Sequence, residues 1–174
     1  MLETPRLILK VATLQEATFM LKLNSDPEVI RFTGDVLLQT VQEAEAIIRE
    51  RQLPQFDKYR MGRFSVYLKD GTYIGWCGLR YFPEKDVVDL GYRFMKKHWG
   101  KGYASEASQV CLQYGFETIK LKRITAEAMP ENTASLKILQ KMGMTFRGLN
   151  TDPNEPPGFI KYDITAAEFD RCKK

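Results

Sequence analysis

The 174-residue chain contains only three cysteines and a single histidine. Cys77, Cys111 and Cys172 are odd in number and far apart, so they indicate neither a disulfide framework nor a zinc site. The lone His98 excludes a multi-histidine metal centre and argues against a serine–histidine nucleophile. We therefore expect a reduced protein with no metal site.

Long apolar runs and a dominant charge sign are also missing. No apolar run approaches the roughly 20 residues that a membrane-spanning helix needs. The opening MLETPRLILK has an acid and a proline where a secretory signal peptide has a basic and then an apolar stretch. The net charge is only +4, and the basic residues are scattered rather than gathered in a stripe. These features favour a cytoplasmic protein that binds neither membrane nor nucleic acid.

The composition is that of an ordinary globular protein, with 44% hydrophobic and 28% charged residues. A chain of this length can bury a substantial hydrophobic core as one domain. It shows no internal repeat and no linker long enough to divide it. We expect a single domain over residues 1–174.

Hydrophobic periodicity and turn residues predict the element order β-α-α-β-β-β-α-β-α-β-β. Strands are expected at residues 6–11, 62–69, 72–82, 87–95, 124–129, 144–149 and 159–165. Helices are expected at 13–23, at 40–52 with its end at Pro54, at 103–119, and at 132–143, with a loop at 24–27. This order indicates an α/β (α+β) fold with a mixed, mostly antiparallel sheet of about seven strands. Its β-α-β crossover opens a crevice at the carboxyl ends of the central strands, where ligands commonly enter.

A glycine turn precedes the third predicted helix. Gly100 and Gly102 tolerate positive φ and carry no Cβ, so several main-chain N–H groups can converge on one point. The following helix adds partial positive charge at its N-terminus, and phosphate is the usual ligand of such an arrangement. A Walker A loop needs Lys-Ser/Thr after its last glycine, whereas Tyr103-Ala104 follows here, and Ser105 replaces the third glycine of a dinucleotide fingerprint. A helix that merely follows flexible residues is an equally open interpretation.

The context of this turn resembles the GCN5-related N-acetyltransferases (GNAT). Residues 97–104 resemble the R/Q-x-x-G-x-G/A turn of that family, with Lys97 at the position of Arg or Gln. The segment NTASLKILQKMGM, residues 132–144, resembles its N-x-x-S/A helix ending in K-x-G-F. LETPRLILK followed by SDPEVIRF is similar to the start of the ribosomal-protein N-terminal (alanine) acetyltransferase branch. The resemblance spans about residues 2–165, and the combination is specific although each piece alone is not.

The resemblance implies a GNAT-like sheet and an enzyme that transfers the acetyl group of acetyl-coenzyme A to a primary amine. The amine, on a protein N-terminus or a small molecule, would attack the thioester directly in a ternary complex. Main-chain N–H groups would bind the pyrophosphate at Gly100, Lys101, Gly102, Tyr103 and Ala104. Phe94 and Met95 would offer main-chain groups to the pantetheine amides. Asn132 would contact the pantetheine arm, act as a helix N-cap, or both.

Asp89 is the candidate base. Strand alternation places Val88 and Leu90 on one face and Asp89 with Arg93 on the other. An acid on a solvated sheet face explains this position equally well. Many members of the family that this chain resembles carry a catalytic glutamate on this strand. The shorter aspartate would act directly or through a water.

Ser135 is the candidate acid for the departing thiolate, with close helix packing as the alternative. Leu139 occupies the position where many relatives carry a tyrosine acid. An α-amine, with pKa about 8, is neutral in roughly one molecule in ten at pH 7, against roughly one in 2,500 for a lysine. A weak base therefore slightly favours an α-amine. A non-catalytic acyl-coenzyme A-binding regulator is the alternative function, and the sequence leaves the acceptor and a homodimer open.

Overall fold

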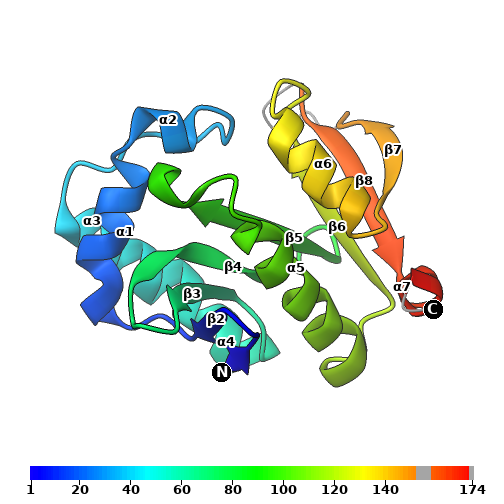
Figure 1. The fold of residues 1–174 in the computed structure, drawn as a ribbon, viewed down its shortest axis with the longest axis horizontal. Helices are drawn as coiled ribbons and strands as arrows, with labels where there is room; N and C mark the ends of the chain where they lie inside the picture. Colours follow the sequence, from blue (N-terminus) through cyan, green and yellow to red (C-terminus); the bar gives the residue numbers. More distant parts are fainter. Residues whose placement is uncertain (152–157, 173–174) are drawn as a thin grey trace.

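A computed structural model describes residues 1–151 and 158–172, which contain an eight-stranded sheet (Figure 1). The spatial order of the strands is β1-β2-β3-β4-β5-β6-β8-β7. Their bounds are Leu2–Glu3, Leu7–Lys10, Arg63–Leu68, Tyr73–Phe82, Val87–Phe94 and Arg123–Ala128 for β1 to β6, Thr145–Leu149 for β7, and Ile160–Thr165 for β8. The mixed, mostly antiparallel sheet is confirmed. The two-residue strand β1 is additional to the seven expected.

The sheet opens between β5 and β6. These strands run parallel and pair at one register position, Asp89 opposite Thr125. By contrast, β4 pairs with β5 along the whole length of β5, from Gly75–Phe94 to Phe82–Val87. Beyond Asp89 the carboxyl end of β5 therefore diverges from β6, at the place where the element order predicts a crevice.

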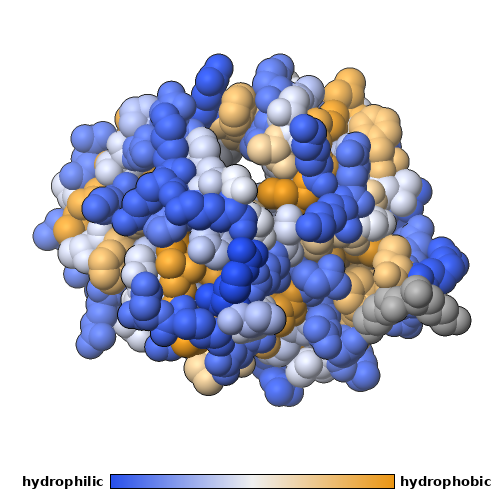
Figure 2. All heavy atoms as spheres, in the orientation of Figure 1, coloured by the Kyte–Doolittle hydropathy of each residue, from blue (hydrophilic) through white to orange (hydrophobic). Residues whose placement is uncertain are grey.

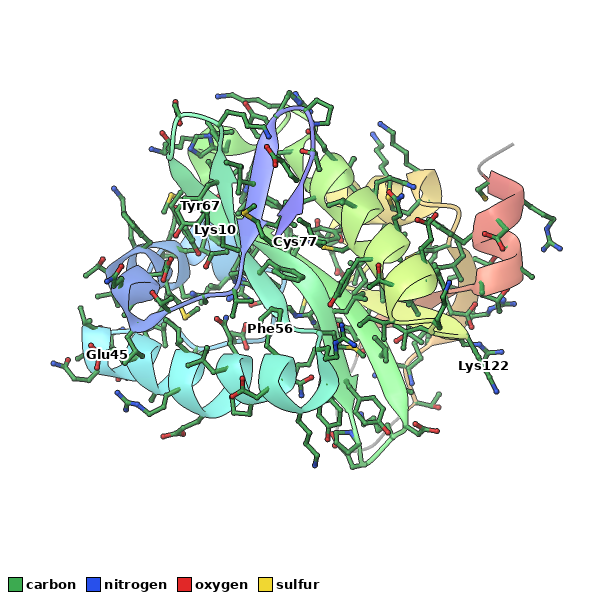
Figure 3. The ribbon with its side chains drawn as sticks, turned by 90° about the horizontal axis from the view of Figure 1, so that it is seen from below. Lys10, Glu45, Phe56, Tyr67, Cys77 and Lys122 are labelled. Carbon is green, nitrogen blue, oxygen red and sulfur yellow. The ribbon has the colours of Figure 1, made fainter. Side chains whose placement is uncertain are left out.

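Helices cover both faces of the sheet. Their bounds are Ala17–Asn24 (α1), Pro27–Ile30 (α2), Val41–Ile47 (α3), Leu53–Tyr59 (α4), Tyr103–Gln113 (α5), Thr133–Lys141 (α6) and Ala166–Cys172 (α7), with π-helical turns at Ile48–Gln52 (η2) and Tyr114–Thr118 (η4) and 3-10 turns at Leu14–Glu16 (η1) and Lys96–His98 (η3). Figure 3 shows α3, η2 and α4 along one face of the central strands and α5 along the other. Cys77 of β4 points toward α5, with its Sγ 3.9 Å from Ser108 Oγ.

The second predicted helix was given the wrong end. It continues past Pro54 to Tyr59, because the widened π turn η2 ends directly before α4, whose first turn contains the proline. In the first turn of a helix, the N–H that proline lacks would have had no intrahelical acceptor. The proline ring also meets no carbonyl of a preceding turn there. The loop expected at residues 24–27 was also too long, since Asn24 ends α1 and Pro27 begins α2.

The C-terminal helix α7 was missed, although its N-terminal signal is present in the sequence. Thr165 N donates to Glu168 Oε2 at 2.8 Å, and Glu168 N donates to Thr165 Oγ1 at 3.3 Å. This is the reciprocal capping box that also begins the helical segments after Thr13 and Thr40. Among the described residues, the helices are all too short or too polar to cross a membrane.

Candidate functional site

The glycine turn has the backbone conformation that the sequence predicts. Gly100 and Gly102 have φ of 73° and 79°, and Gly102 is the N-cap residue of α5. As a glycine, Gly102 has no side chain with which to cap this helix. Because the first N–H groups of a helix lack intrahelical acceptors, the first turn of α5 is left with donors for an external anion.

Arg6 supports this turn from the start of β2, a role that the sequence reasoning missed. Its Nη1 donates to the carbonyl oxygen of Lys101 at 2.9 Å, and its Nε donates to Glu106 Oε2 at 2.6 Å. Thr4 Oγ1 also donates to Glu106, at 2.6 Å. Burial opposes ionisation of Glu106, but the hydrogen bonds from Thr4 and Arg6 outweigh it and lower the pKa of Glu106. The only sequence feature that pointed to Arg6 was the segment TPRL, which is part of the opening LETPRLILK that resembles the family.

A cavity of about 400 Å³ begins at this turn and extends between the end of β5 and α6. Most of the predicted cofactor-binding residues line it: Gly100, Gly102, Tyr103 and Ala104 from the turn, Phe94 from β5, and Asn132 at the start of α6. Lys101 does not line the cavity, and its side chain is exposed. This position still allows the predicted main-chain contact from Lys101.

Met95 is not brought to this cavity. It is buried in the core, and its N–H donates to the carbonyl oxygen of Ile74 at 2.9 Å. Its carbonyl oxygen accepts from His98 N, also at 2.9 Å. The Phe94 carbonyl oxygen accepts from Trp99 Nε1 at 2.7 Å. Of the two residues predicted to bind the pantetheine amides, only Phe94 lies where it can do so.

His98 is a further cavity residue. Its side chain is 9% exposed, and neither ring nitrogen has a hydrogen-bond partner within the part of the chain that the structure describes. Burial, with a further contribution from Lys97 and Lys101, lowers the pKa of His98. The imidazole is therefore neutral at pH 7 and retains one donor and one acceptor nitrogen.

A second cavity, of about 430 Å³, occupies the opening between β5 and β6. It shares Phe32, Thr33, Tyr92, Arg93, Asn132 and Ser135 with the first cavity, so the two cavities adjoin. Figure 2 shows the surface hollowed in the upper middle of this view, between the segment after α2 and α6. Two ligands can therefore approach each other from opposite cavities.

Asp89 lies on the wall of the second cavity. As the alternation predicts, Val88 and Leu90 are buried in the core on the opposite face of β5. Arg63 Nη2 donates to Asp89 Oδ2 at 2.5 Å, and Arg63 Nη1 donates to the main-chain oxygen of Asp89 at 3.0 Å. A Cβ at Gly91 would lie 2.6 Å from the Arg63 guanidinium. Glycine at this position therefore makes room for the arginine that holds the carboxylate.

Ser135 lies where the two cavities meet. Its N–H donates to Asn132 Oδ1 at 3.1 Å, which confirms Asn132 as the N-cap of α6. Its Oγ is 2.7 Å from the hydroxyl of Tyr92. Burial raises the pKa of Tyr92 well above its usual value, although the bond to Ser135 works in the opposite direction. The role of Tyr92 was missed from the sequence, because periodicity does not show where a hydroxyl is directed.

Residues 6–145 match the acetyltransferase (GNAT) domain family. The chain belongs to the GNAT family. It is 33% identical over 159 residues to the uncharacterized N-acetyltransferase p20 of Bacillus licheniformis. The aligned region covers 90% of this chain and 89% of the relative. A GNAT acetyltransferase structure from Bacillus anthracis has a TM-score of 0.80 and 25% identity, covering 95% and 98% of the two chains. RimL, a ribosomal L7/L12 α-N-protein acetyltransferase in complex with coenzyme A, shares the fold with a TM-score of 0.79 and 15% identity, covering 93% and 95%.

These comparisons confirm the predicted resemblance to the GNAT family and the predicted fold class. They also confirm that the chain is an acetyl-coenzyme A-dependent acetyltransferase. The roles assigned to individual residues stay predictions. Leu139 is buried and lines the second cavity, so no tyrosine hydroxyl comes from that position of α6. Tyr92, from the facing strand, brings a phenol to Ser135 instead.

Proposed function

We propose that this GNAT enzyme binds acetyl-coenzyme A in the first cavity and a primary amine in the second. The amine attacks the thioester carbonyl directly, with both reactants bound together. The meeting of the two cavities at Tyr92 and Ser135, which line both, carries this proposal, since adjoining cavities allow both reactants to bind at once. Holding two reactants in register can supply roughly 7–11 kcal/mol of the barrier.

On the cofactor side, the pyrophosphate accepts hydrogen bonds from the main chain of residues 100–104. The positive φ of Gly100 and Gly102 and the uncapped start of α5 fit an anion at this place. Such charge-assisted bonds contribute roughly 1.5–3 kcal/mol each. Phe94 and Asn132 lie further along the same cavity, where the pantetheine arm would extend.

On the acceptor side, Asp89 receives the proton that the ammonium group loses, directly or through a water. The nitrogen then forms its bond to the carbonyl carbon, loses its second proton to solvent, and the carbon–sulfur bond breaks. Arg63 holds the Asp89 carboxylate on the cavity wall throughout. An α-amine, already neutral in roughly one molecule in ten at pH 7, is the acceptor that makes the smallest demand on this base.

The departing thiolate is stabilised by Ser135. Tyr92 and Ser135 are hydrogen bonded at the meeting point of the cavities, so the phenol can donate to Ser135 while the serine donates to sulfur. The raised pKa of Tyr92 keeps the phenol protonated at neutral pH. The pair acts as a donor chain, and solvent supplies the final proton to the thiolate.

Thiol release from acetyl-coenzyme A tests this proposal on a panel of peptides with free N-termini and small primary amines, with mass spectrometry of the acetylated product. We expect turnover with at least one class of amine and saturation in both substrates without a ping-pong pattern. Tight coenzyme A binding without turnover across the panel would instead support an acyl-coenzyme A-binding regulator.

A further inference from the structure

One face of strands β3, β4 and β5 carries three arginines around a tryptophan. Cross-strand pairs place Arg80 opposite Asp89 and Trp76 opposite Arg93, while Arg63 extends over the same face from β3. The guanidinium carbons of Arg63 and Arg93 are each 5.3 Å from the centroid of the Trp76 ring.

This face lines a third cavity, of about 570 Å³, between the sheet and the helical segment α3-η2-α4. Arg51 and Gln52 of η2 line it from the helical side. The cavity shares Arg63, Trp76 and Arg93 with the second cavity, so it continues the acceptor side of the cleft away from the thioester.

The charges of the third cavity do not balance. Arg63 is paired with Asp89, and Arg93 forms short hydrogen bonds to Asp35 and to Asn24 Oδ1. Among the described residues, no carboxylate forms an ion pair with Arg51 or Arg80. Arg80 does lie over the Phe82 ring, with its guanidinium carbon 4.4 Å from the ring centroid, but neither positive charge has a carboxylate partner among these residues.

Arg80 is the less exposed of these two arginines. Its Nε is buried and has no hydrogen-bond partner among residues 1–151 and 158–172. Burial, together with repulsion from Arg63 and Arg51, lowers the pKa of Arg80, although the carboxylates of Asp89 and Glu84 act in the opposite direction. A guanidinium removed from water next to like charges is costly unless an anion accompanies it.

Gln52 provides a second, independent observation. It is 7% exposed, and its Oε1 is buried without a hydrogen-bond partner in the described part of the chain. A buried amide oxygen of this kind normally accepts a hydrogen bond. A ligand in the third cavity would thus meet guanidinium donors and one unused acceptor, which suits an anionic group attached to an N–H-bearing chain.

We propose that the acceptor carries a carboxylate or phosphate, which binds Arg80 and Arg51 in the third cavity while its amine reaches the second. This inference rests on the proposed function and assigns its substrate class. Guanidinium groups bind both anions through paired N–H donors. A polyamine acceptor would bring more positive charge to a region that already has an excess, so the same geometry disfavours it.

Two arms of matched acceptors test the proposal and separate the sources of the anion. The first compares peptides with two aspartates after the N-terminal residue against the same peptides with asparagines. The second compares 5-aminopentanoate with its amide. We expect the wild-type enzyme to show at least tenfold higher kcat/KM for the anionic member in one arm, mainly through KM.

Variants locate the effect. Arg80→Gln and Arg51→Gln should each reduce the ratio of anionic to neutral kcat/KM at least fivefold, and Arg80→Lys should restore part of it. Arg49→Gln is the matched control, since Arg49 is exposed, lies two residues from Arg51 and pairs with Glu45. Thermal midpoints and coenzyme A affinity show whether each variant is folded.

Calorimetry of the preferred anionic probe on the enzyme–coenzyme A complex gives a readout independent of turnover. If none of the acceptors is acetylated, each anionic probe is titrated in turn. Binding by wild type and loss in Arg80→Gln would support the anion site even if no amine were acetylated, in which case the proposed function alone fails. Equal kcat/KM for both members in both arms, or a preference that survives the Arg51→Gln/Arg80→Gln double variant, would overturn the inference.

Discussion

The two sides of the cleft are built differently. The side proposed for the cofactor has two glycines with positive φ and the start of α5, and few charged side chains line it. The acceptor side is built from side chains on the face of β3, β4 and β5, held in place by ion pairs and stacking on Trp76. Backbone recognition needs only glycines at defined spacing, whereas side-chain recognition depends on tertiary placement.

This difference predicts which substitutions damage which substrate. Changes at the glycine turn should impair acetyl-coenzyme A binding for every acceptor. Changes on the sheet face should alter acceptor use while leaving coenzyme A affinity intact. The predictions below test this separation, beginning with the largest expected effect.

Gly102→Val should weaken coenzyme A binding about 100-fold, equivalent to losing one or two charge-assisted main-chain bonds. The φ of 79° also strains any β-branched residue there, so we expect about 1–2 kcal/mol less stability. Calorimetry gives the affinity and urea unfolding gives the stability. Gly71→Val is the matched control, because Gly71 has φ of 86° in a hairpin with open space around it. If both variants bound coenzyme A normally, the separation would fail on the cofactor side.

Asp89→Asn should reduce kcat about 100-fold, within the range for removal of a general base, while coenzyme A affinity changes less than twofold. The loss should be larger for a lysine-type amine than for an α-amine, because the former is more completely protonated at pH 7. Initial rates at saturating acetyl-coenzyme A measure this effect. An equal loss for both amines would indicate that Asp89 only positions Arg63.

Tyr92→Phe should lower kcat about three- to tenfold by removing the 2.7 Å contact to Ser135 Oγ. Ser135→Ala should have a similar effect, and the double variant should lose little more, because neighbours in one hydrogen-bond chain are not additive. Single-turnover rates check the cycle. Fully additive losses would mean that the two hydroxyls act separately.

Glu106→Gln should cost about 1 kcal/mol of stability at pH 7, since it weakens the bonds to Thr4 and Arg6. Because folding lowers the pKa of Glu106, its carboxylate contributes fully to the free energy of unfolding at pH values above the unfolded-state pKa near 4.5. This contribution is lost as the pH falls through the pKa of the folded state. Urea unfolding at pH 7 and pH 3.5 measures this difference. Glu3→Gln, at the exposed Lys69 pair, should cost less. An undiminished Glu106→Gln effect at the lower pH would contradict the assignment.

The same contrast explains what could be predicted from the sequence. Strands β2 to β8 and the N-cap at Asn132 followed from alternation and capping residues, which act over a few positions. The glycine turn was recognisable because its function lies in the backbone. Helix α7 was missed despite its capping box, and the continuation past Pro54 depends on the π turn η2, which has no sequence signature.

The acceptor side was hidden for a physical reason. Arg63 of β3 lies 26 positions from Asp89 of β5, so only the folded sheet brings the two side chains together. Arg80 and Gln52 carried no motif at all. Alternation placed Asp89 on the correct face, but it could not show that an arginine from β3 holds its carboxylate.

A crystal structure with coenzyme A tests the central claim most directly, because that claim concerns which atoms hold the pyrophosphate. We predict phosphate oxygens within about 3.2 Å of at least three main-chain nitrogens of residues 100–104, with the pantetheine arm passing Asn132 toward Ser135. A pyrophosphate held elsewhere, or bound by side chains while those nitrogens remain without contact to it, would contradict the account.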